Sequence, residues 1–402
     1  MKTVFTYLKG DRVIWVITIM LCLVSILVVY SSTGTLAYKQ AGGNTFYYLS
    51  KQLLFVGISL LTVFITHRIN YKALYTLSKY LYYASIPLLI YTLVRGVSIN
   101  EAARWITLPG GFSFQTSDLA KLALMMYLAT QISLKQPDIK DFKKGFVPLL
   151  IPIGLTCMLI LPANFSTAAL IFVSSMVLLY IGRVRIKHLS LLAGVGVVGI
   201  GIFILVALNM PDSGRVGTWK RRIENFVSKD GENFQADQAK IAVATGGMFG
   251  KGPGQSVQRN ILPHPYSDFI FAIIIEEYGL ITGIFIMSLY LILLFRSVAL
   301  IKKCPTTFPA FLVAGMVILI VLQAFAHIGV NTGVFPVTGQ TLPMISMGGT
   351  SMIINGIQIG IILSVSKEIL KQSSANAPSV QTTNETDNEV EDEGNVTDKI
   401  ID

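Results

Sequence analysis

Charged side chains are scarce in this sequence: Asp, Glu, Lys and Arg make up only 13% of its 402 residues. A typical soluble domain carries about twice that fraction, so an ordinary water-soluble enzyme is excluded. Hydrophobic residues make up 52% of the chain, and the mean hydropathy is +0.62. Several apolar runs approach about 20 residues, which is long enough to cross a bilayer as a helix. The sequence therefore predicts a polytopic membrane protein.

Cysteine and histidine are also scarce, with three and four residues respectively. Cys22 and Cys157 lie in apolar runs and Cys304 follows two lysines, so no pair indicates a disulfide. The histidines are scattered along the chain, and neither residue type shows the spacing of a metal site. We therefore expect no metal centre held by the protein alone.

Acidic residues are few except near the C-terminus. Residues 385–402 hold eight acids and one base, a net charge of −7, which leaves +17 for the rest of a chain whose total is +10. The segment 372–402 cannot bury enough apolar surface to fold alone, so we predict a disordered acidic tail. Basic residues on a membrane protein reflect topology and anionic headgroups. No basic soluble domain is present, so a nucleic-acid partner is not expected.

Ten apolar segments predict ten membrane-spanning helices within residues 1–371, and the predicted fold class is all-α. The first segment follows Lys9 and Arg12 and lacks a small-residue cleavage site, so we interpret it as a retained span, not a signal peptide. The predicted spans are residues 13–33, 52–69, 77–95, 116–133, 146–163, 166–182, 188–208, 268–296, 307–331 and 346–368.

Lysine and arginine gather in alternate short loops, which predicts that both termini are cytoplasmic. The one long loop, residues 209–267, then lies outside the membrane, although it carries eight cations, including Arg215 and Lys251. Cations on the outer face suit an anionic ligand. The alternative is a solvated amphipathic segment that lies on the headgroups of the outer leaflet.

Carboxylates stand out in the stretch from Lys251 to Gly283. Asp268 begins the eighth apolar span, and Glu276 and Glu277 follow about two turns later. Such residues are costly in lipid and are therefore functional candidates, unless Asp268 only caps the helix and the glutamates only pair with cations. At about 100° per residue, Glu276 lies about 80° from Asp268 and about 12 Å deeper. We expect Glu276 to share a cavity with Asp268, and Glu277 to form a helix–helix contact.

Three further polar segments are candidate sites. Arg104 and Trp105 follow the third span, where they either bind phosphate or anchor the chain at the interface. Asp118 and Lys121 share one helix face, which predicts an ion pair that is either architectural or presents the lysine to an anion. Asn164 lies in a polar break between two apolar spans, where irregular backbone is tolerated if it lines a cavity.

Two glycine-rich segments complete the candidates. Residues 246–252 depart from the Walker A pattern at both ends, so we expect a tight outer loop whose backbone closely approaches a ligand. Ser346, Thr350 and Ser351 lie where the tenth span begins, and backbone amides and hydroxyls at a helix start can hold an anion. The alternative there is close helix packing through small residues.

Together these segments resemble the SEDS family of bacterial cell-wall proteins, which includes FtsW, RodA and SpoVE. The resemblance runs from about residue 10 to residue 370 and implies a ten-span helical membrane protein with a large outer loop between spans seven and eight. The run from Leu262 to Ile270 and the glycines just before Thr350 and Ser351 are more similar to FtsW, of cell division, than to RodA, of elongation. The blocks that carry it, in chain order, are residues 103–106, 115–121, 246–254, 262–277 and 336–351.

The resemblance implies a peptidoglycan glycosyltransferase that polymerises lipid II, an undecaprenyl-pyrophosphoryl disaccharide-pentapeptide, at the outer face of the bacterial cytoplasmic membrane. A class B penicillin-binding protein would be its partner, together with divisome proteins at the septum. Asp268, which matches the residue essential in the family, would be the general base. Four basic residues would stabilise the leaving diphosphate: Arg104, Lys121, Arg215 and Lys251. A divalent cation, Mg²⁺ or Mn²⁺, could assist.

Three positions depart from the family pattern and put the supporting roles around Asp268 in question. Asp118 replaces a glutamate, Asn164 replaces an aspartate, and residues 264–266 replace a Glu-x-His sequence. Two other functions stay open. Helical spans with a polar break also fit a transporter that flips lipid II across the bilayer. A non-catalytic scaffold that recruits the transpeptidase would not need Asp268 at all.

Overall fold

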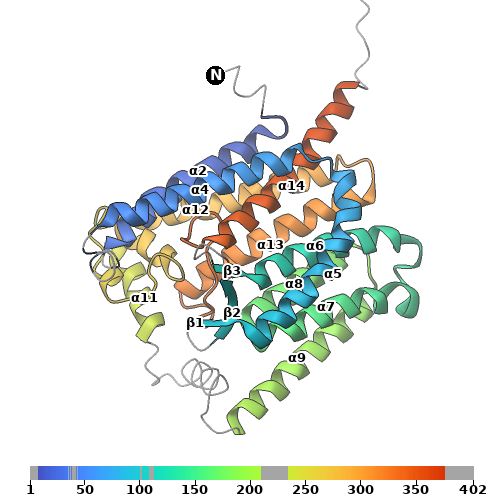
Figure 1. Cartoon of the computed structure of the whole chain (residues 1–402), viewed down its shortest axis with the longest axis horizontal. Coiled ribbons are helices and arrows are strands. Elements are labelled where there is room, and N and C mark those ends of the chain that lie inside the picture. The colour runs from blue at the N-terminus through green and yellow to red at the C-terminus, as the bar shows by residue number, and fades with distance from the viewer. Residues whose placement is uncertain are drawn as a thin grey trace, which may run out of the picture.

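The computed structural model describes residues 8–34, 36, 38, 42, 44–99, 102–107, 113–209 and 234–375. Within them, ten long helices coincide with the ten predicted apolar segments, and α11 (Phe234–Gly246) lies in the long loop (Figure 1). The ten helices are α2 (Arg12–Ser32), α4 (Thr45–Arg68), α5 (Tyr71–Arg95), α6 (Thr116–Leu134), α7 (Val147–Ile160), α8 (Phe165–Ile181), α9 (Ile186–Asn209), α12 (Ile270–Ile301), α13 (Thr307–Asn331) and α14 (Thr350–Ala375).

Six helices of the described part are long and apolar enough to cross a membrane: α2, α4, α7 with its preceding π-helical turn (Phe142–Phe146), α12, α13 and α14. The all-α polytopic membrane fold is therefore confirmed. The total of ten spans stays a prediction, as does the disordered tail, most of which lies outside the described residues.

Side-chain caps fix where several helices begin. Each cap is a side chain that accepts a hydrogen bond from a backbone N–H in the first turn of its helix. The caps are Asp11 of α2, Asn44 of α4, Asn70 of α5 and Asn164 of α8. These short polar side chains satisfy N–H groups that have no partner within the helix. The caps explain why polar residues interrupt the apolar runs at these points.

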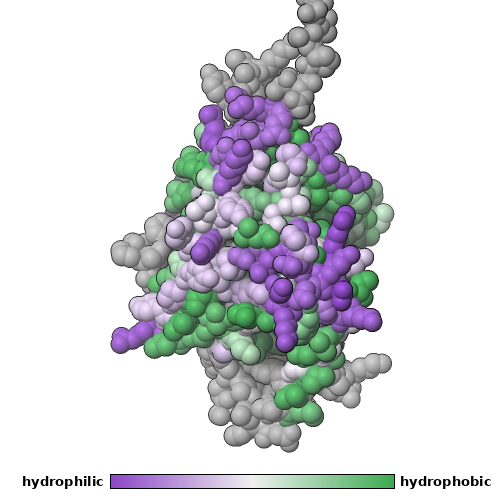
Figure 2. All heavy atoms as spheres, turned by 90° about the vertical axis from the view of Figure 1, so that its right-hand side faces the viewer, coloured by the Kyte–Doolittle hydropathy of each residue, from purple (hydrophilic) through white to green (hydrophobic). Residues whose placement is uncertain are grey.

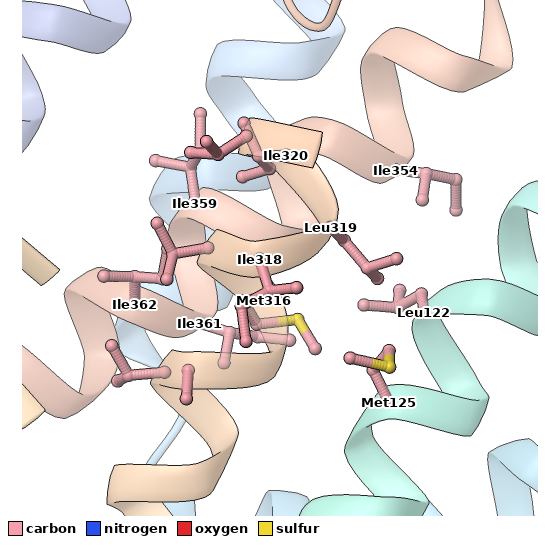
Figure 3. Packing of buried hydrophobic residues seen from close by; sticks show 14 of the residues in the cluster. Leu122, Met125, Met316, Ile318, Leu319, Ile320, Ile354, Ile359, Ile361 and Ile362 are labelled. Atoms are coloured by element: carbon pink, nitrogen blue, oxygen red, sulfur yellow. The ribbon is translucent and has the colours of Figure 1, made fainter. Parts of the chain in front are cut away.

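Helix α13 lies at the centre of the bundle and packs against α6, α8, α12 and α14. In Figure 3, Met316 and Leu319 of α13 lie between Leu122 and Met125 of α6 on one side and Ile359 and Ile362 of α14 on the other. All six of these side chains are buried. Lipid tails are as apolar as these side chains, so close packing between helices, not escape from water, stabilises the arrangement.

Helices α4 and α14 pack with their backbones close together. Gly356 and Gly360 of α14 leave no space for a side chain, because a Cβ atom would lie 2.7 Å from Thr62 Oγ1 at the first and 2.6 Å from Thr66 Cβ at the second. Small residues at this spacing let two backbones approach closely. The contact holds the first half of α14 beside the second half of α4.

A small antiparallel sheet lies between α5 and α6 and was not predicted. Its strands are β1 (Val97–Ile99), β2 (Ala102–Thr107) and β3 (Ser113–Gln115), in the order β1-β2-β3. Trp105 of β2 pairs with Gln115 of β3, immediately before α6 begins. The sheet therefore fixes the tryptophan of the predicted outer-loop motif next to the helix bundle.

Hydrophilic side chains gather on the end of the molecule that Figure 2 shows. This end carries the loops between α6 and α7 and between α12 and α13 (Figure 1), where Lys140, Lys143, Lys302 and Lys303 are exposed. The sequence assigns both loops to the cytoplasm. The cytoplasmic location of the termini stays a prediction, since no membrane is part of the structure.

Candidate active site

A cavity of about 430 Å³ lies at the opposite end of the bundle, beside the sheet. Its walls come from the end of the α2 segment, the start of α4, β2 and β3, the turn before α12, and the loop that leads into α14. Its lining residues are Leu36, Tyr48, Lys51, Phe55, Trp105, Ser113, Gln115, Asn164, His264, Tyr266, Ser267, Asp268, Gly339, Thr341, Met347, Gly348, Gly349, Thr350 and Ser351.

Asp268 is the one carboxylate among these lining residues, and it is half-buried. The hydroxyl of Ser267 donates a hydrogen bond to its Oδ1 atom at 2.9 Å. Helix α12 begins at Ile270, and its N-cap residue is Phe269, which makes no side-chain capping bond. The alternative that Asp268 is the N-cap of this helix is therefore wrong.

The turn that carries Asp268 is held against the loop before α14. Met347 N–H donates to the carbonyl of Tyr266 at 3.0 Å, and Ser346 Oγ donates to the carbonyl of Ser267 at 2.8 Å. Ser346 is buried and is not among the lining residues, so it supports the turn from behind. The predicted anion site at the start of the tenth span is thus divided: Thr350 and Ser351 line the cavity.

His264 and Tyr266, where the chain leaves the family pattern, both line the cavity. His264 Nδ1 lies 3.1 Å from the Tyr266 hydroxyl, and His264 adopts a left-handed backbone conformation with φ of 56°. Burial raises the pKa of Tyr266, and the nearby Tyr48 and Asp268 raise it further. The phenol therefore stays protonated at neutral pH and can donate a hydrogen bond to a ligand.

Trp105 and Asn164, predicted from separate segments, meet in this cavity. Asn164 also caps α8 by accepting a hydrogen bond from Thr167 N–H at 3.2 Å. An amide oxygen performs this capping role as well as a carboxylate oxygen would. The replacement of a family aspartate by Asn164 therefore keeps the local backbone and removes one negative charge from the cavity wall.

Lys51 was missed by the sequence reasoning, yet it is the single lysine or arginine among the described lining residues. It lies in the first turns of α4 and its side chain is exposed. Arg104 belongs to β2, but its side chain lies outside the described part, and Arg215 lies wholly outside it. A signal for Lys51 existed, because cations are rare in the short loops assigned to the outer face.

Comparison with known protein families gives a match over nearly the whole chain. The model of the cell cycle protein family of FtsW, RodA and SpoVE matches residues 11–371. The chain belongs to this family. Stage V sporulation protein E of Bacillus subtilis is 34% identical over 362 residues, which cover 89% of this chain and 97% of that protein. A probable peptidoglycan glycosyltransferase FtsW of Coxiella burnetii is 32% identical over 365 residues, with 89% and 96% covered.

Solved structures share the fold of this FtsW/RodA/SpoVE member. A chain from a peptidoglycan synthase complex that coordinates polymerization and crosslinking superimposes with a TM-score of 0.71 at 25% identity, covering 89% of this chain and 98% of that one. The rod shape determining protein RodA of Thermus thermophilus gives a TM-score of 0.62 at 23% identity, covering 89% and 97%. The second likeness supports the fold alone.

The predicted ion pair of this family member is confirmed: Lys121 Nζ lies 2.9 Å from Asp118 Oδ1, and both side chains are buried. The same ammonium donates to Gln323 Oε1 at 2.8 Å, and Gln323 donates to the carbonyl of Thr341 at 2.8 Å. Thr341 lines the cavity, whereas Asp118 and Lys121 are not among its lining residues. Two hydrogen bonds through one intervening residue, Gln323, therefore connect Lys121 to the cavity wall.

Glu276 does not line the cavity, in contrast to the sequence expectation. It is fully buried, pairs with Lys251 Nζ at 2.7 Å, and accepts hydrogen bonds from the Ser256 hydroxyl and from the N–H groups of Val257 and Gln258. The outer loop folds over this face of α12 and supplies every one of these partners. The Lys251 ammonium therefore pairs with Glu276, and Lys251 is not among the residues that line the cavity. The expected role of Lys251 as a diphosphate ligand does not fit this position.

Glu277 forms the predicted contact between helices. Its carboxylate accepts a hydrogen bond from Ser31 of α2 and lies 3.8 Å from Arg259 Nη1. Arg259 in turn donates to the carbonyl of Ser31 at 2.8 Å. The two adjacent glutamates thus fasten the segment after Lys251 to α12 and to the end of α2.

The glycines of residues 246–252 do permit a close backbone approach, but to α12 and not to a ligand. A Cβ atom on Gly250 would lie 2.3 Å from the Glu277 carbonyl oxygen, and one on Gly246 would lie 2.2 Å from that of Ile275. Helix α12 is interrupted at Gly279, whose φ is 83°, and Leu280 N–H donates to the Gly247 carbonyl. This segment therefore pairs with an opened turn of α12.

Proposed function

We propose that this chain is a peptidoglycan glycosyltransferase that polymerises lipid II at the outer face of the bacterial cytoplasmic membrane, as an FtsW-type enzyme of cell division. The observation that carries the proposal is the Asp268 carboxylate in the wall of a cavity of about 430 Å³, at the end of the bundle away from the loops that the sequence assigns to the cytoplasm. A single positioned carboxylate is the group that a glycosyl transfer of this kind needs as general base.

The reaction joins two lipid-linked sugars. The 4-hydroxyl oxygen of the acceptor attacks the anomeric carbon of the donor, and Asp268 accepts the proton of that hydroxyl. The bond from the anomeric carbon to the diphosphate oxygen breaks, and the lipid diphosphate leaves with the electron pair. Attack from the opposite side inverts the α-linked donor into a β-1,4 linkage. The diphosphate needs positive charge, not a proton, to leave.

Lys51 is the candidate that supplies this charge from within the cavity, with Arg104 as a second candidate in the adjoining strand. The hydroxyls of Thr350 and Ser351 can donate hydrogen bonds to phosphate oxygens. The described residues contain no group of three or more His, Cys, Asp or Glu that could hold a metal ion. A Mg²⁺ or Mn²⁺ ion would therefore be held mainly by diphosphate oxygens and water, with few ligands from the protein.

The proposal includes a class B penicillin-binding protein that cross-links the strands, divisome proteins, a location at the septum and cytoplasmic termini. The likeness to a chain of a peptidoglycan synthase complex supports a transpeptidase partner. The resemblance to FtsW sequences supports the divisional role over the elongation role of a RodA-type polymerase.

One experiment separates the enzyme from its rivals. The full chain is purified in detergent with its class B transpeptidase and supplied with lipid II. Detergent micelles have no two sides, so glycan strands formed there identify a polymerase. Lipid II movement across vesicle membranes, without polymer in detergent, would instead identify a flippase. Normal growth on the Asp268→Asn variant would identify a scaffold.

Substitution of Lys51 by methionine is expected to raise the KM for lipid II about 10-fold, because a charge-assisted hydrogen bond to phosphate contributes about 1.5–3 kcal/mol. Methionine keeps most of the unbranched length of the side chain and removes the ammonium. Steady-state polymerisation at several lipid II concentrations measures the change. The matched control is Lys72→Met, which removes an exposed lysine of α5 that does not line the cavity. Equal KM values for both variants would exclude Lys51 from substrate binding.

A further inference from the structure

Asn331, the last residue of α13, is fully buried against the turn that carries Asp268. Its side-chain Nδ2 donates to the carbonyl of Asp268 at 3.2 Å and to the carbonyl of His327 at 2.8 Å. Its Oδ1 accepts from Ala272 N–H at 3.0 Å. One carboxamide therefore joins α13 to backbone groups on both sides of Phe269.

These three partners determine the orientation of the amide. Two of them are carbonyl oxygens, which only accept, and the third is an N–H group, which only donates. Rotation of the amide by 180° would place its oxygen against two carbonyls and its NH₂ against an N–H group. Both hydrogens of Asn331 Nδ2 are used, so the side chain is fully satisfied in a buried position.

Helix α12 needs this contact because its own N-cap provides none. The first N–H groups of a helix have no intrahelical acceptor, and Phe269 has no side chain that can serve. Ala272 N–H makes only a tight-turn bond to Phe269 O at 3.1 Å besides the bond to Asn331. Asn331 thus caps α12 from a neighbouring helix.

The same face of α13 supports the other cavity wall. Gln323 and His327 precede Asn331 by eight and four residues, so the three lie in one row along the helix. Gln323 bonds the Thr341 carbonyl, and His327 Nδ1 lies 2.7 Å from the Gln340 carbonyl. The central helix of the bundle therefore holds the loop wall and the Asp268 turn in one rigid frame.

We propose that Asn331 is a positioning residue that fixes the Asp268 carboxylate in the cavity through the backbone of its turn. This inference rests on the proposed function, in which Asp268 is the general base. Asn331 is not among the residues that line the cavity, so it acts through Asp268 and not by touching substrate. A misplacement of about 1 Å at a catalytic group can cost about 10²-fold in rate.

The test replaces Asn331 by leucine, of similar size, in the full chain with its transpeptidase. We expect kcat for lipid II polymerisation to fall about 10–100-fold while the KM stays unchanged. Hydrogen–deuterium exchange of peptides that cover residues 268–275 should become faster, because the Ala272 amide loses one of its two acceptors and the turn loses its contact with α13. Asn331→Asp, which keeps the oxygen that accepts from Ala272, should restore slow exchange but not kcat.

Thr332→Val is the matched control. Thr332 Oγ1 donates to the Ile328 carbonyl at the same end of α13, and no contact joins it to the Asp268 turn among those the structure describes. It should change neither exchange at residues 268–275 nor kcat. Unchanged exchange in Asn331→Leu would overturn the inference whether or not the chain polymerises lipid II. Faster exchange with unchanged kcat in an active enzyme would overturn it too. An inactive wild-type chain would refute the proposed function instead, and the exchange result would still decide whether Asn331 holds the turn.

Discussion

The Asp268→Asn variant is expected to polymerise lipid II about 10²–10⁴-fold more slowly than the wild-type chain, because an amide cannot accept the proton of the acceptor hydroxyl. Asparagine has the same size and still accepts the hydrogen bond from Ser267. The backbone bonds of the turn, including that from Asn331 to the Asp268 carbonyl, do not involve the substituted atom. The fold and the binding of the transpeptidase should therefore be unchanged, and gel analysis of glycan strands measures the rate.

Asp237→Asn provides the control for this experiment. Asp237 lies on α11 in the same outer loop, and its side chain is about half exposed and pairs with Lys240. Loss of that charge should leave polymerisation within about two-fold of wild type, since exposed pairs contribute little. Wild-type rates in Asp268→Asn would exclude it as the base. Equal losses in both variants would indicate that the charge of the loop, and not the Asp268 carboxylate, controls the rate.

Periodicity and length were enough to predict the helices, because a membrane helix must satisfy its backbone within one long apolar segment. The ion pair of Asp118 with Lys121 followed from a spacing of three on one helix. Trp105 was a candidate because tryptophan favours the membrane interface, and Asn164 because it lies in a polar break between two apolar spans. The structure brings both residues into one cavity. Features of this kind can be predicted from the sequence because they depend on residues that are close together in the chain.

Contacts between distant segments could not be predicted in the same way. The helical-wheel argument assumed that α12 is regular from Asp268 onward, whereas it begins at Ile270 and pairs with the outer loop on the face of Glu276. Lys51 and Asn331 lie in ordinary positions of their own helices. Each gains its importance from segments more than 50 residues away, which no local pattern of one sequence encodes.

Truncation of Glu276 to alanine is expected to destabilise the protein by about 3–5 kcal/mol, because the change leaves a buried site without its carboxylate. The hydroxyl of Ser256 and two loop amides would lose their acceptor, and the ammonium of Lys251 would lose its carboxylate partner and keep the hydroxyl of Thr245. Lys251 is about one-third exposed, since its side chain shows 32% of its surface, so water compensates part of its loss. The midpoint of thermal unfolding in detergent should fall clearly below that of wild type.

Comparison with an exposed ion pair on the same loop makes this prediction decisive. Asp237→Ala removes the partner of Lys240, and these two side chains are 50% and 52% exposed, so we expect a loss of no more than about 1 kcal/mol. The double variant Glu276→Leu with Lys251→Met should recover part of the stability, because apolar replacement of both partners leaves no buried charge. If Glu276→Ala unfolds like wild type but polymerises as poorly as Asp268→Asn, Glu276 is a second carboxylate that the reaction requires and the loop contacts are incidental. A large loss of stability with normal activity per folded molecule would instead assign Glu276 to the attachment of the outer loop, and leave Asp268 as the carboxylate on which the chemistry depends.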